Sequence, residues 1–123
     1  MTAYKNTSRG NTGAKKPTSN PVFAQLEIFV GDWAMEASVN GTVLARARAS
    51  FHWMDNGFFL VQHSTSEPPL TTTPQVWIDN NPNPLTAIIA YDDHTRQFWY
   101  VYADSRGVRR IYQMSFENYV WKI

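Results

Sequence analysis

Residues 33–52, WAMEASVNGTVLARARASFH, decide the fold. The dipeptide Asn40-Gly41 near their centre is a preferred pair for a two-residue hairpin turn, because both turn positions need a positive φ. After this turn the side chains alternate, with Ala45, Ala47, Ala49 and Phe51 on one face and Arg46, Arg48, Ser50 and His52 on the other. The stretch therefore predicts two antiparallel strands, at 33–39 and 42–52, with one apolar face.

The chain after this hairpin continues in the same way. Strands are predicted at 58–66, 76–78, 85–91, 97–103, 108–117 and 119–123. A spacing of roughly 8–12 residues between strands, with short turns, is typical of an antiparallel up-and-down meander. A sheet of this kind hides its edges by curling into a barrel. We therefore expect a mainly β fold, a barrel that is either complete or incomplete.

A short helix is predicted just before the hairpin. Asn20-Pro21 suits its start, since Asn is a good N-cap and Pro fits the first helical position. Phe23, Leu26 and Val30 follow at helical spacing. Such a helix is too short to be stable alone, so we expect it to lie against the sheet.

The first twenty residues differ from the rest. They have no apolar period and carry basic but no acidic side chains, at Lys5, Arg9, Lys15 and Lys16. We expect residues 1–20 to be a disordered basic arm and residues 21–123 to be one domain.

Composition limits the function classes. The 123 residues hold no cysteine, so neither a disulfide framework nor a thiolate metal site is predicted. The net charge of +1 gives no global field that would favour nucleic acid. The sequence shows neither a secretory signal nor an apolar run that could span a membrane. We therefore expect a cytoplasmic protein with neither a nucleic acid nor a membrane as partner.

The last segment, 119–123, is amphipathic and needs a neighbour. It either pairs back to 33–39 and closes a small barrel, or it leaves an open edge. An open edge favours a homodimer, because unpaired backbone groups are a template for another chain.

A family resemblance agrees with this fold. Gly31-Asp32-Trp33 after a helix resembles the Gly-x-Trp opening of lipocalins and their calycin relatives. The stretches 88–93, 104–108 and 112–115, in this order, are similar to an uncharacterised bacterial family of lipocalin-like proteins. The resemblance covers 21–123 and implies that Trp33 closes one end of the barrel. It also implies further strands, although this sequence ends at Ile123.

The resemblance supplies no cofactor. The haem-binding calycins use a histidine late in the chain, and no histidine follows His94 here. No two of the three histidines lie at i, i+4 helical spacing, so we predict no metal site. The sequence also contains no nucleophile motif, phosphate loop or dinucleotide motif, so an enzyme is not favoured.

Several residues are candidates for a ligand pocket. Alternation along 108–117 places Arg110 and Tyr112 on the inward face, like the Arg-x-Tyr pair with which fatty-acid-binding proteins hold a carboxylate. Alternatively, Arg110 stacks on Trp33 or pairs with an acid such as Glu36 or Asp104. The predicted ligand-binding residues are Trp33, His63, Trp77, Trp99, Arg110 and Tyr112.

Two functions follow from the sequence. The first is binding of a small, largely apolar molecule, with or without a carboxylate, in the barrel cavity. The second is a β-rich homo-oligomer without a pocket, which the aromatic side chains on both faces of 97–103 also favour.

Overall fold

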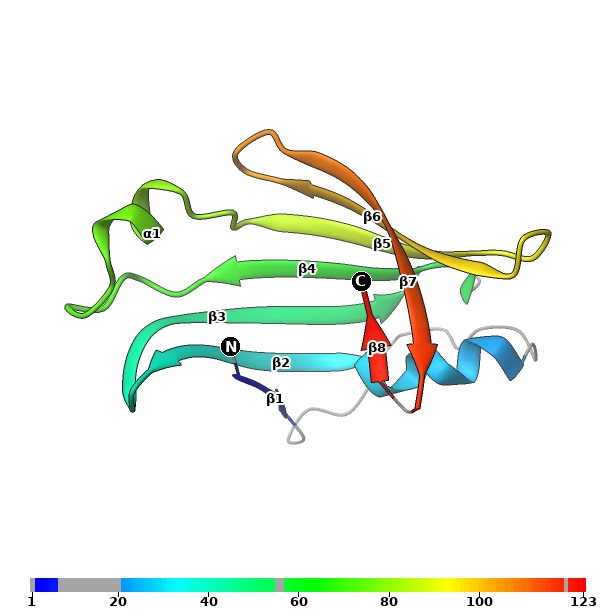
Figure 1. The fold of residues 1–123 in the computed structure, drawn as a ribbon, viewed down its shortest axis with the longest axis horizontal. Helices are drawn as coiled ribbons and strands as arrows, with labels where there is room; N and C mark the ends of the chain where they lie inside the picture. The colour runs from blue at the N-terminus through cyan, green and yellow to red at the C-terminus, as the bar shows by residue number, and fades with distance from the viewer. Residues whose placement is uncertain (1, 7–20, 55–56, 119) are drawn as a thin grey trace.

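The computed structural model describes residues 2–6, 21–54, 57–118 and 120–123. They form an antiparallel sheet whose strands lie in chain order, from β1 to β8 (Figure 1). The strands are β1 (Thr2–Asn6), β2 (Gly31–Val39), β3 (Thr42–Trp53), β4 (Leu60–Ser66), β5 (Leu85–Asp92), β6 (Gln97–Asp104), β7 (Arg109–Glu117) and β8 (Val120–Lys122). The helices are η1 (Pro21–Phe29), a 3₁₀ helix, and α1 (Gln75–Asp79). The predicted mainly β meander is confirmed.

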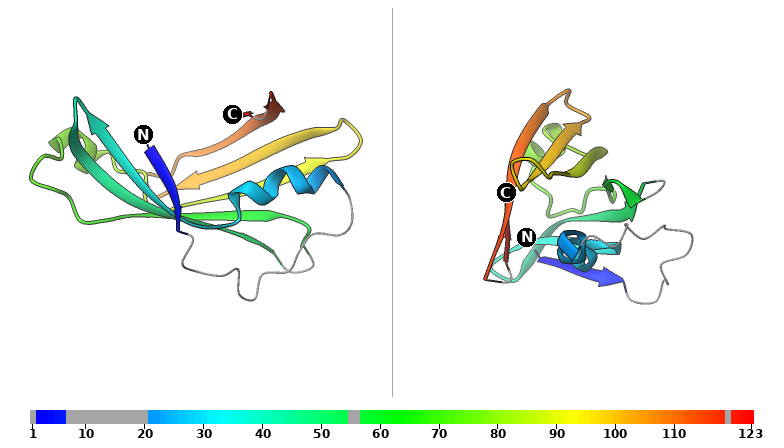
Figure 2. Two further views of the ribbon diagram at one scale, coloured as in Figure 1. Left: turned by 90° about the horizontal axis from the view of Figure 1, so that it is seen from below. Right: turned by 90° about the vertical axis from the view of Figure 1, so that its right-hand side faces the viewer.

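The sheet curls into a half-barrel around η1 (Figure 2). β8 pairs with β7, whereas β2 pairs with β1 on one side and β3 on the other. Within the described residues, no ladder therefore joins the two ends of the sheet. Of the two alternatives for the last segment, pairing back to 33–39 is wrong, because β1 already occupies that edge of β2.

The central hairpin forms as predicted. Asn40 and Gly41 have φ values of 51° and 80°. The register changes from Ala37↔Ala45 to Ser38↔Val43, which leaves Leu44 as an extra residue in β3. This β-bulge bends the start of β3 and frees backbone groups there.

The start of the chain differs from the prediction. Residues 2–6 form β1, which pairs with β2 from Thr2↔Glu36 to Asn6↔Asp32, rather than belonging to a disordered arm. An edge strand can pair through its backbone alone, so the segment needs no apolar period to join the sheet. Residues 7–20, the rest of the predicted arm, lie outside the described residues.

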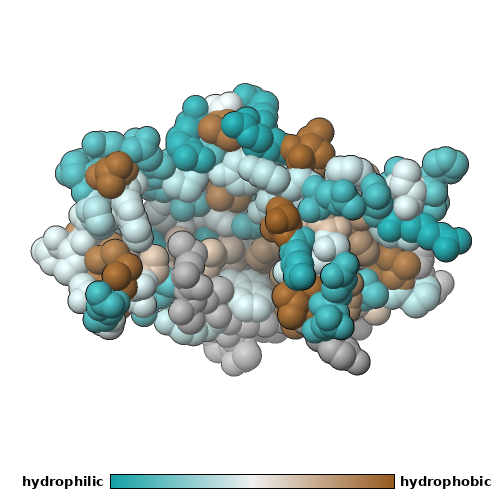
Figure 3. Space-filling model, viewed as in Figure 1, coloured by the Kyte–Doolittle hydropathy of each residue, from teal (hydrophilic) through white to brown (hydrophobic). Residues whose placement is uncertain are grey.

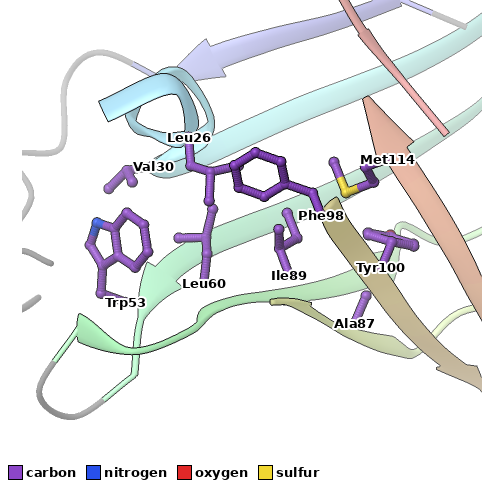
Figure 4. Packing of buried hydrophobic residues seen from close by; sticks show 9 residues of the cluster. All are labelled: Leu26, Val30, Trp53, Leu60, Ala87, Ile89, Phe98, Tyr100 and Met114. Atoms are coloured by element: carbon purple, nitrogen blue, oxygen red, sulfur yellow. The ribbon is translucent and has the colours of Figure 1, made fainter. Parts of the chain in front are cut away.

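One face of the sheet, which we call the inner face, is covered in part by η1. Cross-strand pairing places Trp53, Leu60, Ile89 and Tyr100 in one row on this face. Leu26 of η1 and Val30, which follows η1, point toward these side chains (Figure 4). The buried cluster consists of Leu26, Val30, Trp53, Leu60, Ala87, Ile89, Phe98, Tyr100 and Met114.

Three tryptophans hold η1 by hydrogen bonds. The indole N–H of Trp33 donates to the carbonyl of Phe29 at 2.7 Å. Trp53 donates to the Glu27 carboxylate at 3.2 Å, and Trp121 donates to the carbonyl of Gln25 at 3.2 Å. The predicted helix is thus confirmed, and its place against the sheet is fixed from β2, β3 and β8. The predicted N-cap Asn20 lies outside the described residues.

The segment predicted as a strand at 76–78 is a helix instead. In α1, the side-chain amide of Gln75 donates to Asp79 at 2.9 Å, and the Asn80 N–H donates to the carbonyl of Val76 at 3.1 Å. A short apolar run is compatible with either a strand or a helix. Prolines flank this run, and proline cannot donate the hydrogen bond that a sheet ladder needs, so the segment is poorly suited to pair with a strand. Among the described residues, no helix has the length and apolar character needed to cross a membrane.

The packing of η1 gives the first testable prediction. Leu26 is 1% exposed, whereas Ile28 of the same helix is 63% exposed. We expect Leu26→Ala to lower the free energy of unfolding by about 2–5 kcal/mol, because it leaves a cavity in the core. Ile28→Ala is the matched control and should change it by less than about 0.5 kcal/mol. Urea unfolding measures both, and equal effects of the two substitutions would contradict this packing.

Candidate functional site

The loop between β4 and β5 folds back over the start of β3. The hydroxyl of Thr73 donates to the carbonyl of Leu44, and that of Thr72 to the carbonyl of Val43, both at 2.5 Å. The Glu67 N–H donates to the carbonyl of Arg46 at 3.0 Å. Pairing of β3 with β4 ends at Ala47↔Ser66, so this loop supplies the partners that β4 does not. These contacts position α1 at one end of the half-barrel (Figure 1).

A pocket of about 390 Å³ lies between α1 and the inner face of β2 and β3. We call it the inner pocket. The apolar side chains that line it include Met35, Ala45, Ala47, Val76, Trp77 and Ile78. On the face that Figure 3 shows, hydrophobic residues lie in separate spots among hydrophilic ones. The inner pocket, by contrast, brings at least six apolar side chains together.

Several polar residues at the inner pocket have partners, whereas the buried Oδ1 of Asn83 has none among the described residues. Ser66 and Asn81 exchange hydrogen bonds of 2.9 and 2.7 Å. Arg46 forms an ion pair with Glu36 at 3.3 Å, and Glu67 forms one with Arg48 at 3.1 Å. These partners reduce the charge that the pocket offers to a ligand.

A polar chain lies on the inner face next to the core. The hydroxyl of Tyr100 donates to the side-chain carbonyl of Gln62, whose amide donates to Ser64 at 2.9 Å. Gln62 and Ser64 are buried, and their mutual bonds satisfy them there. Burial raises the pKa of Tyr100 to about 12, with a further rise from nearby Tyr102.

The turn between β6 and β7 is organised by Asp104. Its carboxylate accepts from Arg106 Nη2 at 2.6 Å, from the Tyr102 hydroxyl at 2.5 Å and from the Arg106 N–H at 2.9 Å. The Arg106 hydrogen bond holds the pKa of Asp104 well below its usual range. Gly107 has φ 83°, a left-handed value that a glycine adopts readily in a tight turn. The role of this carboxylate is therefore structural.

The structure separates the six predicted pocket residues. Only Trp77 of the six lines the inner pocket. Trp33 and His63 border a second pocket of about 270 Å³, which they share with Arg48. Trp99 pairs with Ala90 and Gln113, which places it on the outer face.

Arg110 and Tyr112 lie on the inner face, as alternation predicts. Arg110 pairs with Tyr102, and Tyr112 pairs with Tyr100. Both are exposed, because η1 covers only the other end of this face. The Arg110 guanidinium donates to the carbonyl of Arg109 at 3.0 Å. The two acids considered above as partners of Arg110 are paired elsewhere, because Glu36 binds Arg46 and Asp104 binds Arg106. Arg110 and Tyr112 do not belong to the inner pocket.

His63, a predicted pocket residue, does not point into the half-barrel. Gln62 and Ser64, its neighbours in β4, are buried on the inner face, so His63 must face outward and is exposed there.

The sequence analysis missed two lining residues of the inner pocket, Val76 and Ile78, because it treated their segment as a strand. The signal that could have found them is the pair of flanking prolines, Pro74 and Pro82.

Comparison with known proteins gave no match, whether to a protein-family model, to a curated protein or to a solved structure. The resemblance to lipocalin-like proteins stays a prediction, and so do the cytoplasmic location and the homodimer.

The outer face carries an apolar row that could serve as the contact surface of the predicted homodimer. Ile88 pairs with Val101 and Val101 with Ile111, and the last two are 41% and 69% exposed.

The buried tyrosine gives the second prediction. An unfolded tyrosine ionises near pH 10, about two units below the pKa of about 12 for Tyr100 in the fold. The contribution of Tyr100 to stability is therefore intact below about pH 10 and falls between about pH 10 and 12. Titration of phenolate absorbance should show a phase near pH 12 that Tyr100→Phe removes. Ionisation of all six tyrosines together near pH 10 in the folded protein would contradict it.

Proposed function

We propose that this protein binds a small, largely apolar molecule in the inner pocket. The observation that carries the proposal is the apolar surface that α1 presents there. The α1 helix has five residues, and three consecutive ones are apolar and exposed: Val76 at 61%, Trp77 at 40% and Ile78 at 37%. A pocket of about 390 Å³ also falls within the range that small-molecule sites occupy.

Burial of this surface supplies the driving force. Each Å² of apolar area removed from water contributes about 25 cal/mol, so a ligand that covers α1 gains affinity without a charged contact. Met35, Ala45 and Ala47 form the opposite wall, and their small or flexible side chains leave room for a ring or an alkyl chain. The hydrogen bonds of Thr72 and Thr73 to β3 hold the two walls at a fixed separation.

The electrostatics favour an uncharged ligand. Arg46 is the cation at the inner pocket, and it is already paired with Glu36. Arg110, the carboxylate anchor expected from the sequence, lies elsewhere on the inner face. We therefore propose a neutral apolar molecule rather than a fatty carboxylate, with Ser66 and Asn81 as the polar groups at its edge.

The test is a fluorescence titration with the uncharged apolar probe N-phenyl-1-naphthylamine. We expect saturable binding to one site. Trp77→Ala removes an apolar wall and Ala47→Phe fills the space, so each should weaken binding about tenfold or more, which equals about 1.4 kcal/mol. Circular dichroism and thermal unfolding would show that both variants keep the fold.

Arg110→Ala is the matched control, because it alters a large exposed side chain of the same face outside the inner pocket. It should leave the affinity for the probe unchanged. The proposal fails if the probe does not bind saturably, or if binding survives both Trp77→Ala and Ala47→Phe in folded protein.

A further inference from the structure

Two histidines that are distant in the sequence meet on the outer face. Ser50 pairs with His63 and His52 pairs with Val61, so His52 and His63 are diagonal neighbours on β3 and β4. Their ring centroids are 5.4 Å apart, with an angle of 20° between the ring planes. Both side chains are exposed, so solvent reaches the pair.

This separation suits a shared metal ion. Two imidazoles that bind one tetrahedral ion through nitrogen bonds of about 2.0–2.1 Å have ring centres about 5 Å apart. The observed 5.4 Å is close to that value, so we expect rotation of the His52 ring about its side-chain bonds to bring one nitrogen of each ring to the ion. The strands themselves need not move.

A third side chain orients one of the rings. Nδ1 of His63 lies 3.2 Å from the hydroxyl of Thr86, its partner across the β4–β5 ladder. A hydrogen bond at Nδ1 leaves Nε2 as the free nitrogen and fixes the plane of the ring. Histidines that ligate metals commonly use their other nitrogen in this way.

The charges around the pair do not oppose a cation. Asp32 and Arg48 lie with His63 at the second pocket, and Arg48 is paired with Glu67 at 3.1 Å. Among the described residues, no group of three or more His, Asp or Glu side chains is placed to hold an ion. The protein therefore supplies two nitrogen ligands, and water or another molecule must complete the coordination.

We propose that His52 and His63 bind one divalent transition-metal ion of the kind that prefers imidazole, such as Zn²⁺, Ni²⁺ or Cu²⁺. The site lies on the opposite face of the sheet from the inner pocket and does not depend on the proposed function. It differs from a closed structural zinc site because two positions on the ion stay open. Those positions are available to an exogenous ligand.

The experiment is a calorimetric titration of the tag-free full chain with ZnCl₂ and, separately, CuCl₂. We expect saturable binding in which both histidines are needed, so His52→Gln and His63→Gln should each weaken it at least tenfold. His94→Gln is the matched control, because His94 is exposed in the turn between β5 and β6, and it should leave the affinity unchanged.

Thr86→Val tests the orientation of the ring while both ligands remain. Loss of such a partner commonly costs 10–100-fold in metal affinity, and we expect a weakening of about tenfold here. Because all three positions are exposed, the variants should keep the unfolding profile of the wild type. Failure to bind either ion, or full affinity in His52→Gln or His63→Gln, would overturn the proposal.

Discussion

The rest of the structure depends on the three indole hydrogen bonds that hold η1 inside the curled sheet. Trp33, Trp53 and Trp121 come from β2, β3 and β8, the strands that surround the helix. Backbone carbonyls near the end of a short helix have no partner within it, and a buried indole N–H needs an acceptor. Trp33 and Trp121 donate to the backbone carbonyls of Phe29 and Gln25, whereas Trp53 donates to the side-chain carboxylate of Glu27. The helix, rather than a ladder between β2 and β8, therefore connects the two ends of the sheet.

The position of η1 also divides the inner face into two parts. Under the helix lies the buried cluster around Leu26 and Leu60, both of which are almost fully inaccessible. Beyond the helix the inner face is open, and there α1 and the loop before β5 cover only the region next to β2 and β3. The inner pocket exists because a short helix fills only part of the half-barrel. The same fact explains why Arg110 and Tyr112 face inward but remain in solvent.

The sequence was sufficient for the parts of the fold that local patterns determine. Asn40-Gly41 specified a turn, and strict alternation specified which side chains of β3 and β7 share a face. It was insufficient for α1, because a short apolar run between prolines has no period of its own. It was also insufficient for β1, which pairs through backbone groups that carry no sequence pattern.

The candidate site was harder to predict than the fold. Trp77, one of the predicted residues, lines the inner pocket, yet the other wall depends on how the loop before β5 folds over β3. The meeting of His52 and His63 depends on the register of β3 and β4. That register follows from the length of the connection between them, and the sequence placed the start of β4 at residue 58 rather than at Leu60. A slip of one residue in that register would move His63 to the other face of the sheet.

The central claim is that η1 holds the half-barrel together without pairing between β8 and β2. Nuclear Overhauser effects in solution test it most directly. We expect contacts from the Trp121 ring to the rings of Phe29 and Phe98, whose centroids lie 5.8 and 5.0 Å away, and contacts between the backbones of β1 and β2. Cross-strand Hα contacts between Val120–Lys122 and Gly31–Val39, with the Trp121 ring away from η1, would instead show a closed barrel and overturn this role of η1.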